Sequence, residues 1–190
     1  MRNNSDVQNI LLTSAGFDNK NIEVKFLELV SKPVETIKIL FIPTAAIRAE
    51  QKSIIPLCKS ELLHAGILEE NIVSYNLDRI MESDEICSYD GIYVCGGSPQ
   101  YLLDQMNKME FYTPLQSFLH SGGVYMGVSA GSIVMAKNLT SNLGYINCIL
   151  SVHDKHGSDV GLLDTNRCPN IKLNDDQAIL IVNDLISVIE

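Results

Sequence analysis

A serine between two glycines is the feature of this chain with the clearest chemical capacity. Residues 127–131 read Gly-Val-Ser-Ala-Gly, an apolar run precedes them at 123–126, and residues 132–137 can begin a helix. This order of strand, sharp turn and helix is that of a nucleophile elbow, in which the serine hydroxyl projects beyond the end of a sheet. The Ala130 N–H at the helix start has no intrahelical partner and can stabilise an oxyanion. We therefore interpret Ser129 as a nucleophile, with a surface serine in a glycine-rich turn as the alternative.

A serine hydroxyl is a weak nucleophile and needs a neighbouring base. The histidines of the chain are His64, His120, His153 and His156. His64 and His120 fall at the ends of predicted helices, where the helix dipole favours them. His153 directly follows an apolar run at 148–152, so we expect it at a strand end of the sheet that presents Ser129. His153 is the candidate general base, and a plain loop histidine is the alternative.

A third group should orient the imidazole, and a carboxylate is the usual choice. The carboxylates after the candidate base are Asp154, Asp159, Asp164, Asp175, Asp176, Asp184 and Glu190. Asp175 and Asp176 directly precede a predicted strand at 178–182, so either can lie at a sheet edge. Spacing does not choose between them, and a solvated turn is the alternative.

Metal binding and disulfide formation are both poorly indicated. A cluster of His153, Asp154 and His156 has a spacing that fits no established ligand set, so we expect no metal and no organic cofactor. The five cysteines are Cys58, Cys87, Cys95, Cys148 and Cys168. Their number is odd and no C-x-x-C pair occurs, and Cys95 and Cys148 lie in apolar runs. This pattern is typical of reduced thiols in a cytoplasmic protein.

Strands and helices alternate over roughly the first 140 residues, as in a doubly wound sheet. Strands are predicted over residues 10–13, 37–42, 72–75, 92–95 and 124–128, and helices over 21–30, 50–65, 101–109 and 113–120. Gly66 is the expected C-cap of the second helix, which Pro56 should kink or start late. The strands lack polar alternation, which favours a mostly parallel sheet covered on both faces. In such α/β sheets the site lies at the carboxyl ends of the strands.

The last part of the chain differs in character. Apolar runs at 178–182 and 185–189 flank Asn183-Asp184, which predicts a C-terminal β-hairpin. Near the start, residues 14–16 repeat the Ser-Ala-Gly of residues 129–131 without the leading glycine. We interpret that repeat as a loop.

Composition bounds the class of protein. The 190 residues are 46% hydrophobic, which suits a single α/β peptidase-like domain over residues 1–190. The net charge of −9 comes without a Lys/Arg cluster, so we expect neither nucleic acid nor a membrane surface as partner. No run approaches the ~18 apolar residues of a membrane span, and no signal peptide is evident. We therefore expect a cytoplasmic protein.

At this point the residues resemble a known family. Residues 128–132 look like the Ser-Ala-Gly elbow of the aspartyl dipeptidase (peptidase E) and cyanophycinase family of serine peptidases. Residues 92–103 resemble the family's Gly-Gly-Asn turn and following helix, residues 143–153 its strand ending in the catalytic histidine, and residues 171–179 its late segment with the third triad member. Residues 39–44 also resemble its second strand. The resemblance implies the class I glutamine amidotransferase-like fold, a flavodoxin-like three-layer sandwich.

The resemblance also implies roles for individual residues. Ser129 would be the nucleophile, His153 the base and Asp175 the orienting acid, a position that is usually glutamate in the family. Asp176 remains a rival for that last role.

The oxyanion and substrate-binding residues implied by the resemblance are Gly96, Gly97, Ser98 and Ala130. The N–H groups of Gly97 and Ala130 would hold the oxyanion. Ser98 stands where the family usually has asparagine.

The implied substrate is a short peptide, but aspartyl specificity is doubtful. The loop before His153 and the segment after it are shorter than in the dipeptidase, and the arginine-containing stretch that reads an N-terminal aspartate is missing. A glutamine amidotransferase role fits poorly, because its cysteine nucleophile and His-x-Glu ending are absent. We predict a serine hydrolase cleaving a short peptide amide. A catalytically silent binding or regulatory domain on the same fold is the alternative, an esterase is a third option, and a homodimer is left open.

Overall fold

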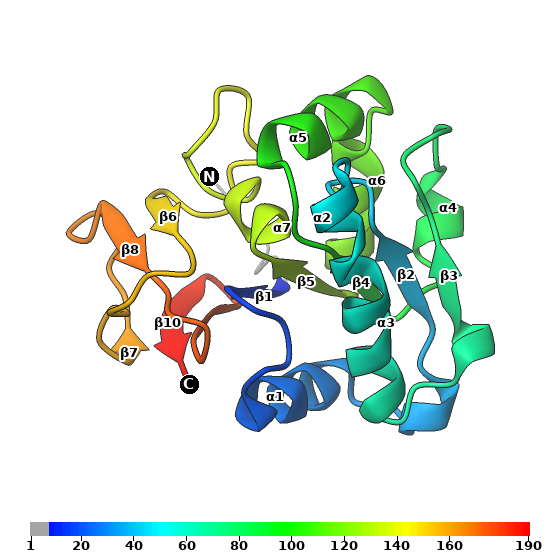
Figure 1. Cartoon of the computed structure of the whole chain (residues 1–190), viewed down its shortest axis with the longest axis horizontal. Helices are drawn as coiled ribbons and strands as arrows, with labels where there is room; N and C mark the ends of the chain where they lie inside the picture. Colours follow the sequence, from blue (N-terminus) through cyan, green and yellow to red (C-terminus); the bar gives the residue numbers. More distant parts are fainter. Residues whose placement is uncertain (1–7) are drawn as a thin grey trace.

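A mixed sheet of eight strands forms the centre of the molecule (Figure 1). The computed structural model describes residues 8–190, and the strands of this sheet lie in the order β3-β2-β4-β5-β1-β9-β10-β7. In chain order they are β1 (Asn9–Thr13), β2 (Ile39–Ile42), β3 (Ile72–Ser74), β4 (Gly91–Val94), β5 (Val124–Val128), β7 (Gly161–Leu162), β9 (Ala178–Val182) and β10 (Leu185–Ile189). The first five run parallel to one another, and antiparallel pairing adds β9 beside β1, then β10 and β7.

Helices cover both faces of the sheet (Figure 1). The α-helices are α1 (Lys20–Val30), α2 (Ala49–Lys52), α3 (Ile54–His64), α4 (Ser83–Ile86), α5 (Pro99–Lys108), α6 (Tyr112–His120) and α7 (Ala130–Ile133), and the 3-10 turns are η1 (Val34–Thr36) and η2 (Glu69–Asn71). Side chains of α1 and α3 pack with one face of the sheet, and those of α5, α6 and α7 with the other. None of the helices in residues 8–190 has the length and apolar character to cross a membrane.

The alternation of buried side chains explains the layers. Leu11 and Leu12 are adjacent in β1 and fully buried, yet they join two different core clusters, one on each face. Tyr125 and Met126 divide in the same way in β5. Strands buried on both faces lack polar alternation, and the prediction of a doubly wound, mostly parallel sheet in a three-layer sandwich is confirmed.

Two local predictions are met by identifiable backbone geometry. The predicted helix over 50–65 divides at Ser53, and Pro56 lies in the first turn of α3, where its missing N–H costs nothing. Gly66 has φ +97° and donates to the Leu63 carbonyl, which closes the helix as the expected C-cap glycine does.

The predicted C-terminal hairpin is present. β9 and β10 pair antiparallel with Val182 opposite Leu185. Asn183 and Asp184 both have positive φ, 50° and 66°, the conformation of the two-residue turn that matches strand twist.

The predicted strand before His153 is placed differently from our expectation. β6 (Ile149–Ser151) pairs with β8 (Asn170–Lys172) in a separate two-stranded sheet, so it does not belong to the sheet that presents Ser129. Only the middle residue of β6 is buried, as for a strand covered on one face. In the main sheet the position next to β1 is occupied by β9, so β6 does not pair there. The expectation that His153 ends a strand of the main sheet was therefore wrong.

The helix after the elbow is also shorter than predicted. α7 ends at Ile133, because the following carbonyls find other partners. The Val134 carbonyl accepts from the Leu143 N–H at 2.9 Å, and the Met135 carbonyl accepts from the Tyr145 N–H at 3.0 Å.

Candidate active site

Ser129 occupies a sharp turn between β5 and α7. Its backbone has φ 48° and ψ −99°, a strained conformation for a residue with a side chain. The Ser129 N–H donates to the Thr13 carbonyl at 3.0 Å, and the Ser129 carbonyl accepts from the N–H groups of Ser132 and Ile133, both at 3.0 Å. These contacts hold the turn in its strained form, so the chain has the backbone of a nucleophile elbow.

Both glycines of the elbow are required by close backbone approach. A Cβ on Gly127 would lie 2.5 Å from the carbonyl carbon of Gly131, and one on Gly131 would lie 2.6 Å from the carbonyl oxygen of Val94. Such distances are too short for any side chain. At these two glycines α7 therefore packs directly against the backbone of β5 and β4.

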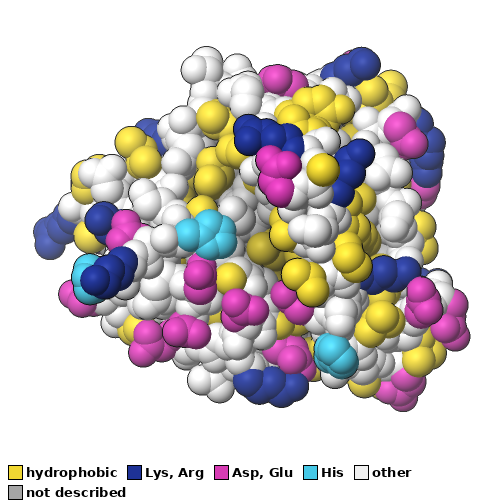
Figure 2. Space-filling model, viewed as in Figure 1, with side chains coloured by type: hydrophobic (Ala, Val, Ile, Leu, Met, Phe, Trp, Pro, Cys, Tyr) yellow, Lys and Arg dark blue, Asp and Glu magenta, His cyan; other side chains and the backbone are white. Residues whose placement is uncertain are grey.

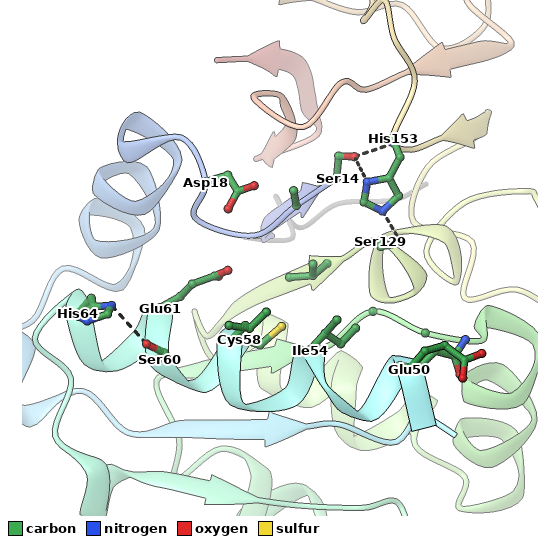
Figure 3. A pocket seen from close by; sticks show the side chains of 16 residues that line it. Ser14, Asp18, Glu50, Ile54, Cys58, Ser60, Glu61, His64, Ser129 and His153 are labelled. Carbon is green, nitrogen blue, oxygen red and sulfur yellow. Dashed lines mark hydrogen bonds between the residues drawn. The ribbon is translucent and has the colours of Figure 1, made fainter. Parts of the chain in front are cut away.

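The structure brings Ser129, His153 and Asp175 together. His153 Nε2 lies 3.1 Å from Ser129 Oγ (Figure 3), and His153 Nδ1 lies 2.6 Å from Asp175 Oδ1. The side chains of His153 and Asp175 are 52% and 55% exposed. The hydroxyl, the imidazole and the carboxylate follow one another in this order. In such an arrangement the imidazole can take the serine proton while the carboxylate orients the imidazole.

The two rival aspartates differ clearly in position. Asp175 contacts the imidazole, whereas the Asp176 carboxylate makes no hydrogen bond or ion pair with any group in residues 8–190. Partial burial raises the pKa of Asp175, but hydrogen bonds from Ser14 and His153 and the nearby imidazole outweigh that effect, so its pKa lies below its ordinary value. A carboxylate that stays ionised is suited to orient an imidazole.

Ser14 joins this group, and the sequence reasoning missed it. Its hydroxyl accepts a hydrogen bond from the His153 N–H at 2.7 Å and donates one to Asp175 Oδ1 at 2.8 Å. Ser14 is fully buried directly after β1. The available signal was its place after a strand in the repeated Ser-Ala-Gly, which we interpreted as a loop.

The predicted oxyanion residues lie at the elbow and in the turn between β4 and α5. Gly97 has φ +143°, and a Cβ there would lie 2.1 Å from the Ala45 carbonyl oxygen, so the close approach requires glycine. Ala130 is the first residue of α7, where the N–H lacks an intrahelical partner. The Ser98 hydroxyl accepts a hydrogen bond from the Tyr101 N–H and caps the N-terminus of α5.

A cavity of about 700 Å³ lies beside Ser129 and His153. One wall is the loop after β1 and the other is formed by α2 and α3 (Figure 3). Ile54, Leu57 and Val128 contribute apolar surface, and Gly96 and Gly97 also line it. Figure 2 shows acidic side chains gathered beside hydrophobic ones on this face.

The charged groups of the cavity are all acidic. Asp18, Glu50 and Glu61 line it, and no lysine or arginine of residues 8–190 is among its lining residues, although Arg48 lies 3.7 Å from the Glu50 carboxylate. Asp18 and Glu61 extend from opposite walls at the end away from Ser129 (Figure 3). Burial raises the pKa of Glu61, partly offset by hydrogen bonds from Tyr93 and the Phe17 N–H. Among residues 8–190, the lining thus offers carboxylates and no lysine or arginine to a bound group.

The other histidines lie elsewhere. His64 ends α3 and His120 ends α6, as predicted, and His64 lines the far end of the cavity. Asp154 pairs with Lys172 at 3.1 Å instead of facing a metal site. Across residues 8–190 no group of three or more His, Cys, Asp or Glu side chains is arranged to hold a metal ion.

Fold and site together define an α/β sandwich of the class I glutamine amidotransferase-like type with an elbow serine. A crystal structure titled as a putative peptidase E protein from Listeria monocytogenes EGD-e has the same fold, with a TM-score of 0.74, 20% identity and coverage of 97% of this chain and 98% of that one. The model of peptidase family S51 matches residues 10–179. The chain belongs to peptidase family S51.

Curated relatives match the chain at low identity and over part of their length. The uncharacterized peptidase PM1590 of Pasteurella multocida (strain Pm70) is 26% identical over 106 residues, 56% of this chain and 51% of that protein. The pyridoxal 5′-phosphate synthase subunit PdxT of Shouchella clausii (strain KSM-K16) is 31% identical over 75 residues, 37% of this chain and 38% of that protein. The chain thus spans about half or less of the length of these two relatives.

Replacing Gly127 by alanine should destabilise the protein strongly. Its Cβ would meet backbone that cannot move away, so we expect a loss of about 3 kcal/mol in the free energy of unfolding, measured in urea. Gly122→Ala is the control, because Gly122 has φ +90° but open space around it, and we expect only about 1–2 kcal/mol there. Equal losses in the two variants would contradict a steric role for Gly127.

Asp175→Asn should slow the reaction of Ser129 with a fluorophosphonate probe by on the order of 10²–10⁴-fold, because the amide cannot hold the imidazole in the required tautomer. The matched control is Asp176→Asn, whose carboxylate does not contact His153, and its rate should stay within about twofold of wild type. A similar loss in both variants, measured as second-order labelling rates, would argue against Asp175 as the orienting acid.

Proposed function

We propose that this chain is a serine hydrolase that cleaves the amide bond of a short peptide. The observation that carries the proposal is the contact chain from Ser129 Oγ through His153 to Asp175, with distances of 3.1 and 2.6 Å. Membership of peptidase family S51 supports the reaction class. The adjoining cavity of about 700 Å³ falls within the range of small-ligand sites.

The geometry suggests a role for each group. As Ser129 Oγ attacks the amide carbonyl, His153 Nε2 takes its proton, and Asp175 accepts the hydrogen bond from Nδ1–H. The negative charge on the carbonyl oxygen would be met by the N–H groups of Gly97 and Ala130. His153 then returns the proton to the leaving amine, and water hydrolyses the acyl-enzyme by the same steps in reverse order.

The charge of the cavity bears on the substrate. An aspartyl side chain entering it would face the carboxylates of Asp18 and Glu61 and that of Glu50, which pairs with Arg48 at 3.7 Å. No lysine or arginine of residues 8–190 is among the lining residues. Like charges within one cavity repel each other. We therefore propose peptides with a neutral or basic residue before the cleaved bond as substrates, in place of aspartyl dipeptides.

A fluorophosphonate probe should label the wild-type protein covalently, and the label should disappear in Ser129→Ala and in His153→Ala. An activated serine is required for this reaction. Ser121→Ala serves as a control and should label like wild type, because Ser121 lies at the end of α6 and its hydroxyl donates to the Phe118 carbonyl. An unlabelled but folded wild type would favour a catalytically silent binding domain on this fold.

The first residue of a dipeptide substrate precedes the cleaved bond. Dipeptides that begin with leucine or lysine should be cleaved with a kcat/KM at least about tenfold above that of dipeptides that begin with aspartate, because charge repulsion alone disfavours aspartate. Asp18→Asn removes one of the two carboxylates at the far end of the cavity and should lower this kcat/KM ratio. Initial rates of amine release measure both effects. A preference for aspartate in wild type would refute the proposed substrate class while leaving the hydrolase reaction intact.

A further inference from the structure

The hydroxyl of Ser14 links the two groups that must activate Ser129. It accepts from the His153 backbone N–H at 2.7 Å, donates to Asp175 Oδ1 at 2.8 Å, and lies 3.3 Å from His153 Nδ1 (Figure 3). A hydroxyl has one hydrogen to donate and two lone pairs to accept with. The Ser14 hydroxyl donates its one hydrogen to the Asp175 carboxylate, and one of its lone pairs accepts from the His153 backbone N–H.

His153 needs such a link because its strand does not provide one. β6 lies in the small second sheet, so no ladder of the main sheet carries His153 to the edge where Ser129 lies. In addition, the His153 backbone has φ 56°, a left-handed conformation that costs energy for a residue with a Cβ. The hydrogen bond from its N–H to Ser14 connects this strained residue directly to the end of the central strand β1.

Asp175 needs the link because water reaches it. Its side chain is 55% exposed, so solvent competes for its oxygens and the contact with His153 alone leaves it free to rotate. Ser14 is fully buried, and its hydroxyl offers a donor from a fixed point. With Asp175 Oδ1 accepting from both Ser14 and His153, the proton of the imidazole lies on Nδ1 and Nε2 is left unprotonated toward Ser129.

We propose that Ser14 is a positioning residue of the hydrolase, which holds the backbone of His153 and the carboxylate of Asp175 in the arrangement that activates Ser129. This inference rests on the proposed function. Ser14 acts only through those two groups and takes no part in bond making. The preceding residue serves the nucleophile in the same way, since the Thr13 carbonyl accepts from the Ser129 N–H.

A double-mutant cycle tests the proposal, with turnover of p-nitrophenyl acetate and labelling by the fluorophosphonate probe as readouts. Ser14→Ala should lower kcat by on the order of 10- to 100-fold while KM stays within about twofold, because misplaced groups affect the reaction step. In an Asp175→Asn background, Ser14→Ala should lower kcat by no more than about threefold, because the effects of substituting groups that act as a unit are not additive.

Controls separate positioning from loss of structure. Ser121→Ala should leave both readouts unchanged, and thermal unfolding of each variant checks that it folds. If Ser14→Ala does not fold, Ser14→Cys takes its place, since a thiol fills similar space but is a weak donor.

The outcomes distinguish the two proposals. A loss in Ser14→Ala that is equally large with Asp175 and with asparagine at that position would overturn the positioning role, as would no loss at all, and either result leaves the hydrolase standing. A wild type that neither labels nor turns over would refute the hydrolase and with it the role of Ser14.

Discussion

The carboxyl end of β1 is the constraint on which the rest of the site depends. Thr13 is fully buried, and its carbonyl accepts from the Ser129 N–H at 3.0 Å and from Ser132 Oγ at 2.8 Å. Its hydroxyl donates to the Gly127 carbonyl at 3.1 Å. One residue therefore fixes both sides of the elbow, and the next residue contacts the imidazole and the carboxylate. Because the interior is close-packed, this end of β1 can shift little, and the strained turn is held by groups that are themselves buried.

Strand direction explains how distant segments reach one edge of the sheet. β1 and β5 run parallel and end together, with Thr13 opposite Val128. β9 runs the other way, so its beginning lies at that edge, with Ala178 opposite Thr13. Asp175 shortly precedes β9 and is thereby delivered to the side where the parallel strands end. An antiparallel neighbour of the central strand thus brings Asp175 to this edge in the residues before its start, as the parallel strand β5 brings Ser129 there directly after its end.

Local signals in the sequence were sufficient for part of this arrangement. The elbow was predictable because a glycine pair, a serine and the flanking strand lie within a few residues. The layered fold was predictable because short apolar runs without polar alternation are separated by predicted helices. The choice between Asp175 and Asp176 was not, because the two are adjacent in one turn and only contacts with distant residues, His153 and Ser14, distinguish Asp175. The separate sheet of β6, the role of Ser14 and the acidic cavity wall from α3 all depend on contacts between segments far apart in the chain. No local pattern reports such contacts.

The central place of β1 also has a consequence for protein synthesis. Its neighbours in the sheet are β5 and β9, which the ribosome makes long after β1, and pairing across such separations is slow to form. The groups of the proposed triad emerge in the order Ser129, His153, Asp175, and the acid comes immediately ahead of the strand that positions it. A nascent chain that has passed the elbow therefore carries a serine without its base and acid. The contact chain from Ser129 through His153 to Asp175 therefore forms only after β9 has left the ribosome and paired with β1.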